Sequence, residues 1–143
     1  MPIVWLLSAL PVGTASSIGG WIGRKLIPRF GDMDTIARTM RVPFPDLDDA
    51  AITALAADMG ENIGRVLGES LHLEAFSGTG NSRLTLSGVE HVEAARSAGR
   101  GVLFVGGHFA NWELFEVALA SLGLSGAKVL QHPHNPYIVE KMA

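Results

Sequence analysis

The sequence predicts an α/β fold in which an N-terminal apolar helix or anchor and a helical region precede the first part of an α/β sandwich. Three observations lead to this prediction: an uncharged apolar run over residues 2–23, helical spacing of apolar residues over 47–71, and alternating helix and strand signals from residue 83 onward. Two to three strands do not close a sheet, so we expect an incomplete fold in this chain of 143 residues. The alternative is a small domain that completes its core by oligomerising.

The N-terminal segment, residues 1–24, is predicted to associate with a membrane. No residue from Pro2 to Gly23 is charged, and the run is long enough to span a bilayer. Trp5 and Trp21 lie near its two ends, where amphipathic rings favour an interface. Glycines, serines and Pro11 dilute the run, so spanning the bilayer and lying in its interface are equally open. The alternative is a buried helical hairpin broken at Pro11.

Charge is distributed unevenly along the chain. Residues 1–45 carry five Lys or Arg residues against two Asp, whereas residues 46–143 carry six against twelve Asp or Glu. Arg24, Lys25 and Arg29 directly follow the apolar run, so the positive-inside rule predicts that the rest of the chain lies at the cytoplasmic face. Nucleic-acid binding would need a broad basic surface with aromatic platforms, which the sequence lacks. The absence of cysteine excludes disulfides and thiolate catalysis.

Residues 25–143 are predicted to form the N-terminal part of an α/β domain. Asp46 is a plausible N-cap for a helix over 47–71, whose apolar face includes Ile52, Met59 and Val66. Further along, the patterns predict alternating strands and helices: a short strand over 83–86, a helix over 88–98, a buried strand over 101–105, a helix over 111–122, a strand over 127–130 and a helix beginning near Pro136.

The most informative segment is Gly106-Gly107-His108-Phe109-Ala110-Asn111-Trp112-Glu113, between the predicted strand over 101–105 and the following helix. Sheets of this class bind ligands at the carboxyl ends of their strands, and His108 falls at such an end. A neutral imidazole can accept a proton near pH 7, and a carboxylate such as Glu113 can fix its orientation. On spacing alone, Asn111 could instead cap the helix and Glu113 could favour its N-terminal dipole.

Residues 101–114 resemble the signature block of the lipid A biosynthesis lauroyl/myristoyl acyltransferases, a branch of the lysophospholipid acyltransferase superfamily. The superfamily's mark is a His, four residues, then Asp or Glu, and Asn-Trp-Glu is characteristic of the lipid A branch. Weaker similarity covers nearly the whole chain, including Pro43-Phe44-Pro45 and Asn135-Pro136, but only about the first half of a typical member. The stretch 131–134, Gln-His-Pro-His, departs from the more usual arginine-containing pattern.

The resemblance implies an O-acyltransferase that needs no metal or cofactor. Its donor would be an acyl thioester on acyl carrier protein or CoA, and its acceptor a hydroxyl of a lipid A precursor, at the cytoplasmic face of the cell inner membrane. His108 would act as the general base and Glu113 would orient it, with Gly107 and Asn111 contacting substrate. Because the chain resembles only half of a family member, we expect it to be inactive alone.

Three alternatives stay open from the sequence. The acceptor could be another glycolipid, such as a phosphatidylinositol mannoside, or an ornithine or glycerol lipid. A metal-dependent hydrolase could use His108, Glu113, His132 and His134 as ligands, because imidazole and carboxylate are suitable groups. The chain could also be a non-enzymatic membrane adaptor or an inactive truncated remnant.

Overall fold

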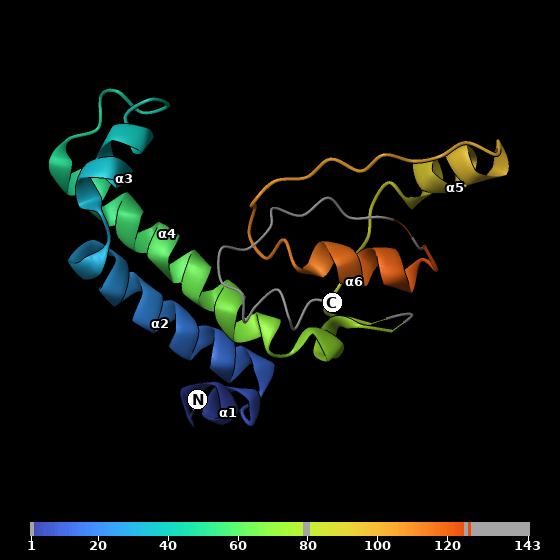
Figure 1. The fold of residues 1–143 in the computed structure, drawn as a ribbon, viewed down its shortest axis with the longest axis horizontal. Helices are drawn as coiled ribbons and strands as arrows, with labels where there is room; N and C mark the ends of the chain where they lie inside the picture. Colours follow the sequence, from blue (N-terminus) through green and yellow to red (C-terminus); the bar gives the residue numbers. More distant parts are fainter. Residues whose placement is uncertain (1, 79–80, 125, 127–143) are drawn as a thin grey trace, which may run out of the picture.

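The computed structural model describes residues 2–78, 81–124 and 126 of the chain. These residues form helices joined by turns and extended segments (Figure 1). In chain order the helices are α1 (Pro2–Ser8), α2 (Val12–Phe30), α3 (Met33–Met40), α4 (Asp49–Ser70), the short 3-10 helix η1 (Leu73–Phe76), α5 (Val89–Ser97) and α6 (Leu114–Ser121).

The predicted α/β fold class is wrong, because residues 2–78, 81–124 and 126 contain helices and no strand. Neither 83–86 nor 101–105 forms a strand, and Leu103 and Val105, predicted to be buried, are each 88% exposed. A strand exists only where a neighbour completes its ladder of N–H and C=O groups, and an apolar run does not supply that neighbour. The predicted strand over 127–130 and the helix near Pro136 lie outside the described residues.

The helices predicted from apolar spacing are confirmed, with small shifts at their ends. The helix predicted over 47–71 is α4, and its N-cap is Asp48 rather than Asp46, since the Asp48 carboxylate accepts a hydrogen bond from the Ala51 N–H at 2.8 Å. Ile52 and Val66 are buried, as predicted, while Met59 is only half-buried. The helices predicted over 88–98 and 111–122 are α5 and α6.

The N-terminal segment folds as two helices, α1 and α2, with the break at Pro11. The Pro11 carbonyl accepts hydrogen bonds from the Thr14 and Ala15 N–H groups and so opens α2. In the part of the chain that the structure describes, no helix combines the length and the apolar character needed to cross a bilayer. The predicted apolar anchor is therefore wrong in its spanning form, because Pro11 divides the apolar run and α2 extends into the charged residues Arg24 and Lys25.

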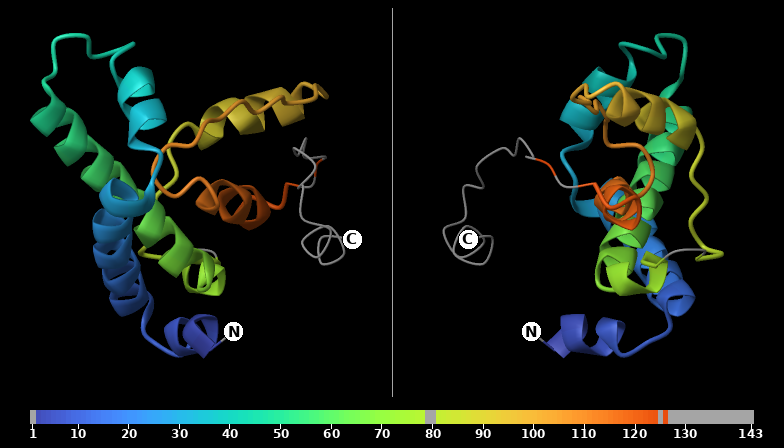
Figure 2. Two further views of the ribbon diagram at one scale, coloured as in Figure 1. Left: turned by 60° about the vertical axis from the view of Figure 1, so that its left-hand side comes forward. Right: turned by 90° about the vertical axis from the view of Figure 1, so that its right-hand side faces the viewer.

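Helices α2 and α4 pack antiparallel along a line of small residues, which we call the glycine seam (Figures 1 and 2). Gly19 faces Gly64 and Gly23 faces Gly60, at a spacing of four residues in each helix. A Cβ added to Gly19 would lie 2.2 Å from the Gly64 carbonyl oxygen, and one added to Gly64 would lie 2.0 Å from the Gly19 oxygen. The two backbones are thus in direct contact, which only residues without a Cβ permit. Gly68 continues the seam against the Ala15 carbonyl.

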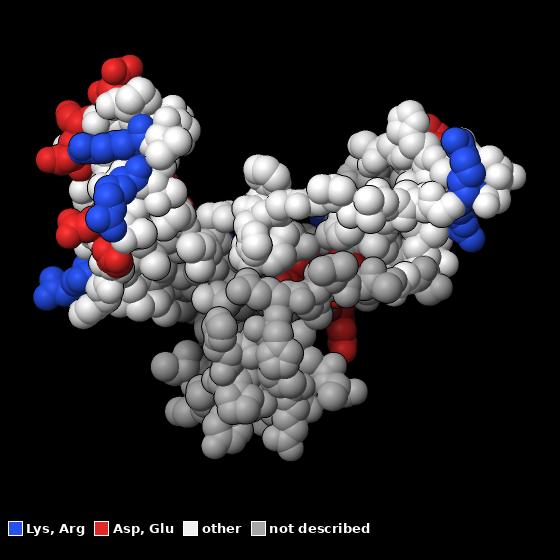
Figure 3. All heavy atoms as spheres, turned by 45° about the horizontal axis from the view of Figure 1, so that its top comes forward, with Lys and Arg blue, Asp and Glu red and all other residues white. Residues whose placement is uncertain are grey.

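Ion pairs connect the same two helices beside the glycine seam. Arg24 of α2 pairs with Asp58 and with Glu61 of α4, and Arg65 donates to Glu61 at 2.5 Å. Exposed pairs of this kind contribute little to stability individually. Figure 3 shows that charged side chains gather mainly toward two ends of the molecule, with a largely uncharged surface between them.

The glycine seam predicts the effect of adding one methyl group. Gly64→Ala should destabilise the fold by about 1–3 kcal/mol or more, because its Cβ would meet a backbone oxygen that cannot rotate away. Gly13→Ala is the matched control: it lies in α2 with nothing within 4 Å of the added atom, so stability should hold or rise slightly. The measurement is thermal unfolding followed by circular dichroism. Equal melting temperatures for the two variants would contradict the packing described.

The ion pairs predict a dependence of stability on acid. The pKa of the Glu61 carboxyl is lowered from 4.5, chiefly because Arg65 donates hydrogen bonds to it, with Arg24 adding a smaller effect. A lowered carboxyl pKa stabilises the fold above the unfolded-state value, and that contribution is lost as pH falls through the folded-state value. We therefore expect stability to fall below about pH 4.5, and Glu61→Gln to reduce the slope of that decline. An unchanged slope in acid denaturation would argue against this role of Glu61.

Candidate functional site

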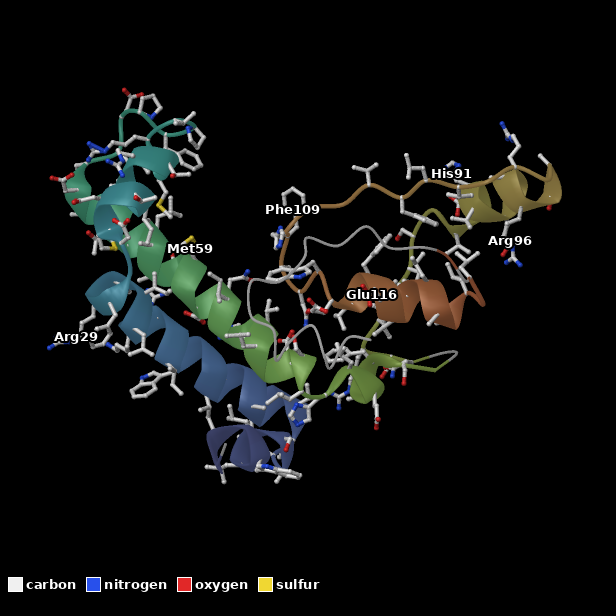
Figure 4. All side chains as sticks on the ribbon, viewed as in Figure 1. Arg29, Met59, His91, Arg96, Phe109 and Glu116 are labelled. Carbon is white, nitrogen blue, oxygen red and sulfur yellow. The ribbon has the colours of Figure 1, made fainter. Side chains whose placement is uncertain are left out.

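The predicted site segment, residues 106–113, forms a bend between the extended segment 101–105 and α6. We call this bend the catalytic turn, after the role that the sequence predicts for His108. Figure 4 shows Phe109 at the bend, ahead of α6. Within it, the Phe109 N–H donates to the Gly107 carbonyl at 2.8 Å, and the Leu114 N–H donates to the Asn111 carbonyl at 3.2 Å. The turn therefore has local hydrogen bonds but no regular structure until α6 begins.

His108 is exposed on this turn, and its ring packs edge-to-face against Trp112, with 4.6 Å between ring centroids. Glu113 lies at the N-cap position of α6 and makes no capping hydrogen bond with its side chain. Among the hydrogen bonds and ion pairs of the described residues, none joins His108 to Glu113. The catalytic pairing of these residues stays a prediction, and active-site hydrogen bonds often tighten only when substrate binds.

The backbone of the catalytic turn is strained at Ala110. Its φ of 45° is in the left-handed region, which costs a residue with a Cβ roughly 1–2 kcal/mol. Gly106 and Gly107 are not in that region. Instead, Gly107 allows a close approach, since a Cβ there would lie 2.7 Å from the Phe109 ring. The left-handed conformation in this turn is thus adopted by Ala110 and not by Gly106 or Gly107.

Asn111 connects the catalytic turn to the α2–α4 pair. Its side-chain amide donates to Glu69 Oε2 at 2.6 Å, and the buried Ser16 hydroxyl of α2 donates to the other carboxylate oxygen, Glu69 Oε1, at 2.7 Å. Asn111 does not cap α6 with its side chain. Its Oδ1 is buried and has no protein partner among the described residues. Its predicted contact with substrate stays a prediction, while its amide is engaged with α4.

Sequence reasoning missed Glu69, although one signal was present. A carboxylate in the last turn of a helix faces the negative end of the helix dipole, which disfavours it. Glu69 occupies that turn of α4, where two hydrogen-bond donors offset the unfavourable position. A negative charge in such a place indicates a specific partner.

His72 connects the end of α4 to the residues that follow α1. Its Nδ1 lies 3.0 Å from the Gly68 carbonyl oxygen and its Nε2 lies 2.8 Å from the Leu10 carbonyl oxygen. The described residues contain no cluster of three His, Asp or Glu side chains suited to a metal ion. Two residues of the metal-hydrolase alternative, His132 and His134, lie outside the described residues.

Two shallow hollows in the described surface are lined by residues other than His108. One is lined by Ser8 and residues 70–75, and the other lies between η1 and α6. Neither includes any residue of the catalytic turn. The predicted site is an open bend with an exposed imidazole, and the role of His108 as a general base stays a prediction.

Comparison with known proteins identifies the family. The model of the bacterial lipid A biosynthesis acyltransferases matches residues 1–143, the entire chain. The chain therefore belongs to the bacterial lipid A biosynthesis acyltransferase family. No curated protein and no solved structure matches it. Membership confirms the resemblance seen in residues 101–114 and means acyl transfer, in general terms, from an acyl donor to a lipid acceptor.

Proposed function

We propose that the protein transfers a fatty acyl group from an acyl thioester, carried by acyl carrier protein or CoA, to a hydroxyl of a lipid A precursor. The observation that carries this proposal is the exposed His108 on a bend of Gly-Gly-His-Phe-Ala-Asn-Trp-Glu sequence, in a chain whose full length matches the family. A single exposed base beside two glycines suits two large substrates that must meet at one histidine.

In the proposed mechanism His108 removes the proton from the acceptor hydroxyl. The oxygen attacks the thioester carbonyl carbon, the carbon–sulfur bond breaks, and the departing thiolate takes the proton from the imidazolium. No covalent acyl-enzyme is required. Trp112 restricts the imidazole by packing against it, and Glu113 stabilises the imidazolium once substrate brings the two side chains together.

We also propose that the protein lies on the cytoplasmic face of the inner membrane, in contact with the interface rather than across the bilayer. The support is a set of exposed apolar side chains on α2: Ile18, Trp21, Leu26 and Phe30. Trp21 is 65% and Phe30 74% exposed. Lys25 and Arg29 accompany them, and Figure 4 shows Arg29 at the end of α2, on the side away from α4. Apolar and basic side chains on one helix favour an anionic lipid surface.

Replacing the proposed base tests the mechanism. His108→Ala in the intact protein should lower acyl transfer roughly 100-fold or more, because a general base contributes about that much. His91→Ala is the matched control, since its imidazole is 86% exposed on α5, and transfer should be unchanged. The measurement is transfer of radiolabelled acyl groups to purified lipid A precursor. Transfer by His108→Ala near the unmodified rate would overturn the proposal.

The membrane proposal is tested on the exposed side chains of α2 alone, leaving the glycine seam intact. Trp21→Ser with Leu26→Ser should weaken binding to vesicles of phosphatidylethanolamine and phosphatidylglycerol more than tenfold, because each large apolar side chain contributes about 1.5–3 kcal/mol when buried. Val42→Ser with Leu67→Ser, two apolar side chains exposed elsewhere, should leave flotation unchanged. Equal flotation of both variants would contradict the proposed surface. Deleting residues 1–23 is a poorer test, because it also removes one side of the seam.

A further inference from the structure

We propose that Glu69 is a positioning residue for the acyl transfer: through Asn111 it holds the catalytic turn, and so His108, against the α2–α4 pair. This inference rests on the proposed function, in which His108 is the base. Both oxygens of the Glu69 carboxylate are used, one by Ser16 of α2 and one by Asn111 of the turn. No other described hydrogen bond or ion pair joins the side chains of residues 106–113 to α2 or α4.

The glycine seam determines where this carboxylate stands. A Cβ on Gly68 would lie 2.5 Å from the Ala15 carbonyl and 3.1 Å from the Ser16 nitrogen, so the two backbones touch one residue before Glu69 and at Ser16 itself. The neighbouring side chains, Ser16 and Glu69, consequently meet at 2.7 Å. Because Ser16 is buried and donates to the carboxylate, the remaining oxygen is directed at a second donor, which Asn111 supplies.

The catalytic turn needs such an attachment. Ala110 is held in the left-handed region, which is unfavourable for a residue with a Cβ. A hydrogen bond to a charged group is stronger than one between neutral groups, so the bond from Asn111 to Glu69 offsets this cost. Asn111 directly follows the strained residue, and Trp112, which packs on the His108 ring, directly follows Asn111. Fixing Asn111 therefore fixes the neighbours that orient the imidazole.

Asn111 is the donor and Glu69 the acceptor of their hydrogen bond, and this direction gives a specific test in the intact protein. Asn111→Asp sets two carboxylates against each other and should lower kcat at least tenfold, while KM for the acyl donor changes less than about twofold. Glu69→Gln alone should cost little, since the Asn111 amide can turn and present its unpartnered Oδ1 to the new amide.

Combining the two substitutions should restore the bond with its polarity reversed. In Glu69→Gln with Asn111→Asp, the introduced glutamine amide accepts from Ser16 and donates to the introduced aspartate carboxylate. We therefore expect kcat of the double variant to recover to within about threefold of that of Glu69→Gln alone. A residue with only a general structural role would not show this reciprocal rescue.

Asn62→Asp is the control for the added charge, since Asn62 is exposed on α4, and it should leave kcat unchanged. Should Asn111→Asp fail to fold, Asn111→Ala, which removes the bond without repulsion, should show the same loss of kcat. The inference is overturned if the single variant keeps full kcat, or if the double variant does not recover. His108→Ala measured in parallel separates the two claims: if it abolishes transfer while Asn111→Asp does not, the proposed function stands and the positioning role falls.

Discussion

The structure depends on the contact between the backbones of α2 and α4. Glycines spaced four residues apart in both helices leave no Cβ between Gly19 and Gly64 or between Gly23 and Gly60, so carbonyl oxygens of one helix meet the glycines of the other. Such a contact restricts rotation of one helix against the other, because most residues beside these glycines would bring a side chain into it. It therefore fixes which side chains of the two helices face each other on either side of the seam.

That alignment brings different side chains together at the two ends of the helix pair. At one end of the seam, Arg24 meets Asp58 and Glu61. At the other end, Ser16 meets Glu69, and the Glu69 carboxylate accepts the Asn111 amide from a turn that is distant along the chain. At the same end, the His72 ring lies between the carbonyl oxygens of Gly68 in α4 and Leu10, just after α1. A rigid pair of helices thus supports an exposed, strained turn that carries the imidazole.

The sequence predicted what is local and missed what depends on distant partners. Helices α4, α5 and α6 follow from apolar spacing and end signals, and the motif around His108 identifies the family because its residues are contiguous. The prediction of strands was wrong because an apolar run such as 101–105 does not specify the neighbouring strand that it would need. In the sequence, the glycines of residues 13–23 are interpreted only as weakening an apolar span. The four-residue spacing of Gly19 and Gly23 is repeated at Gly60, Gly64 and Gly68, and this repeat indicates the contact between the helices. The role of Glu69 requires knowing that α2 lies beside α4.

The most direct test of this account is whether Ser16 and Asn111 are coupled in turnover, since both side chains donate to Glu69. A double-mutant cycle on kcat, with Ser16→Ala, Asn111→Ala and the combined variant of the intact protein, measures that coupling. If the helix pair positions the catalytic turn through Glu69, removing Ser16 should cost kcat in the unmodified protein and almost nothing further once Asn111 is gone. Independent effects that multiply in the combined variant would contradict the account.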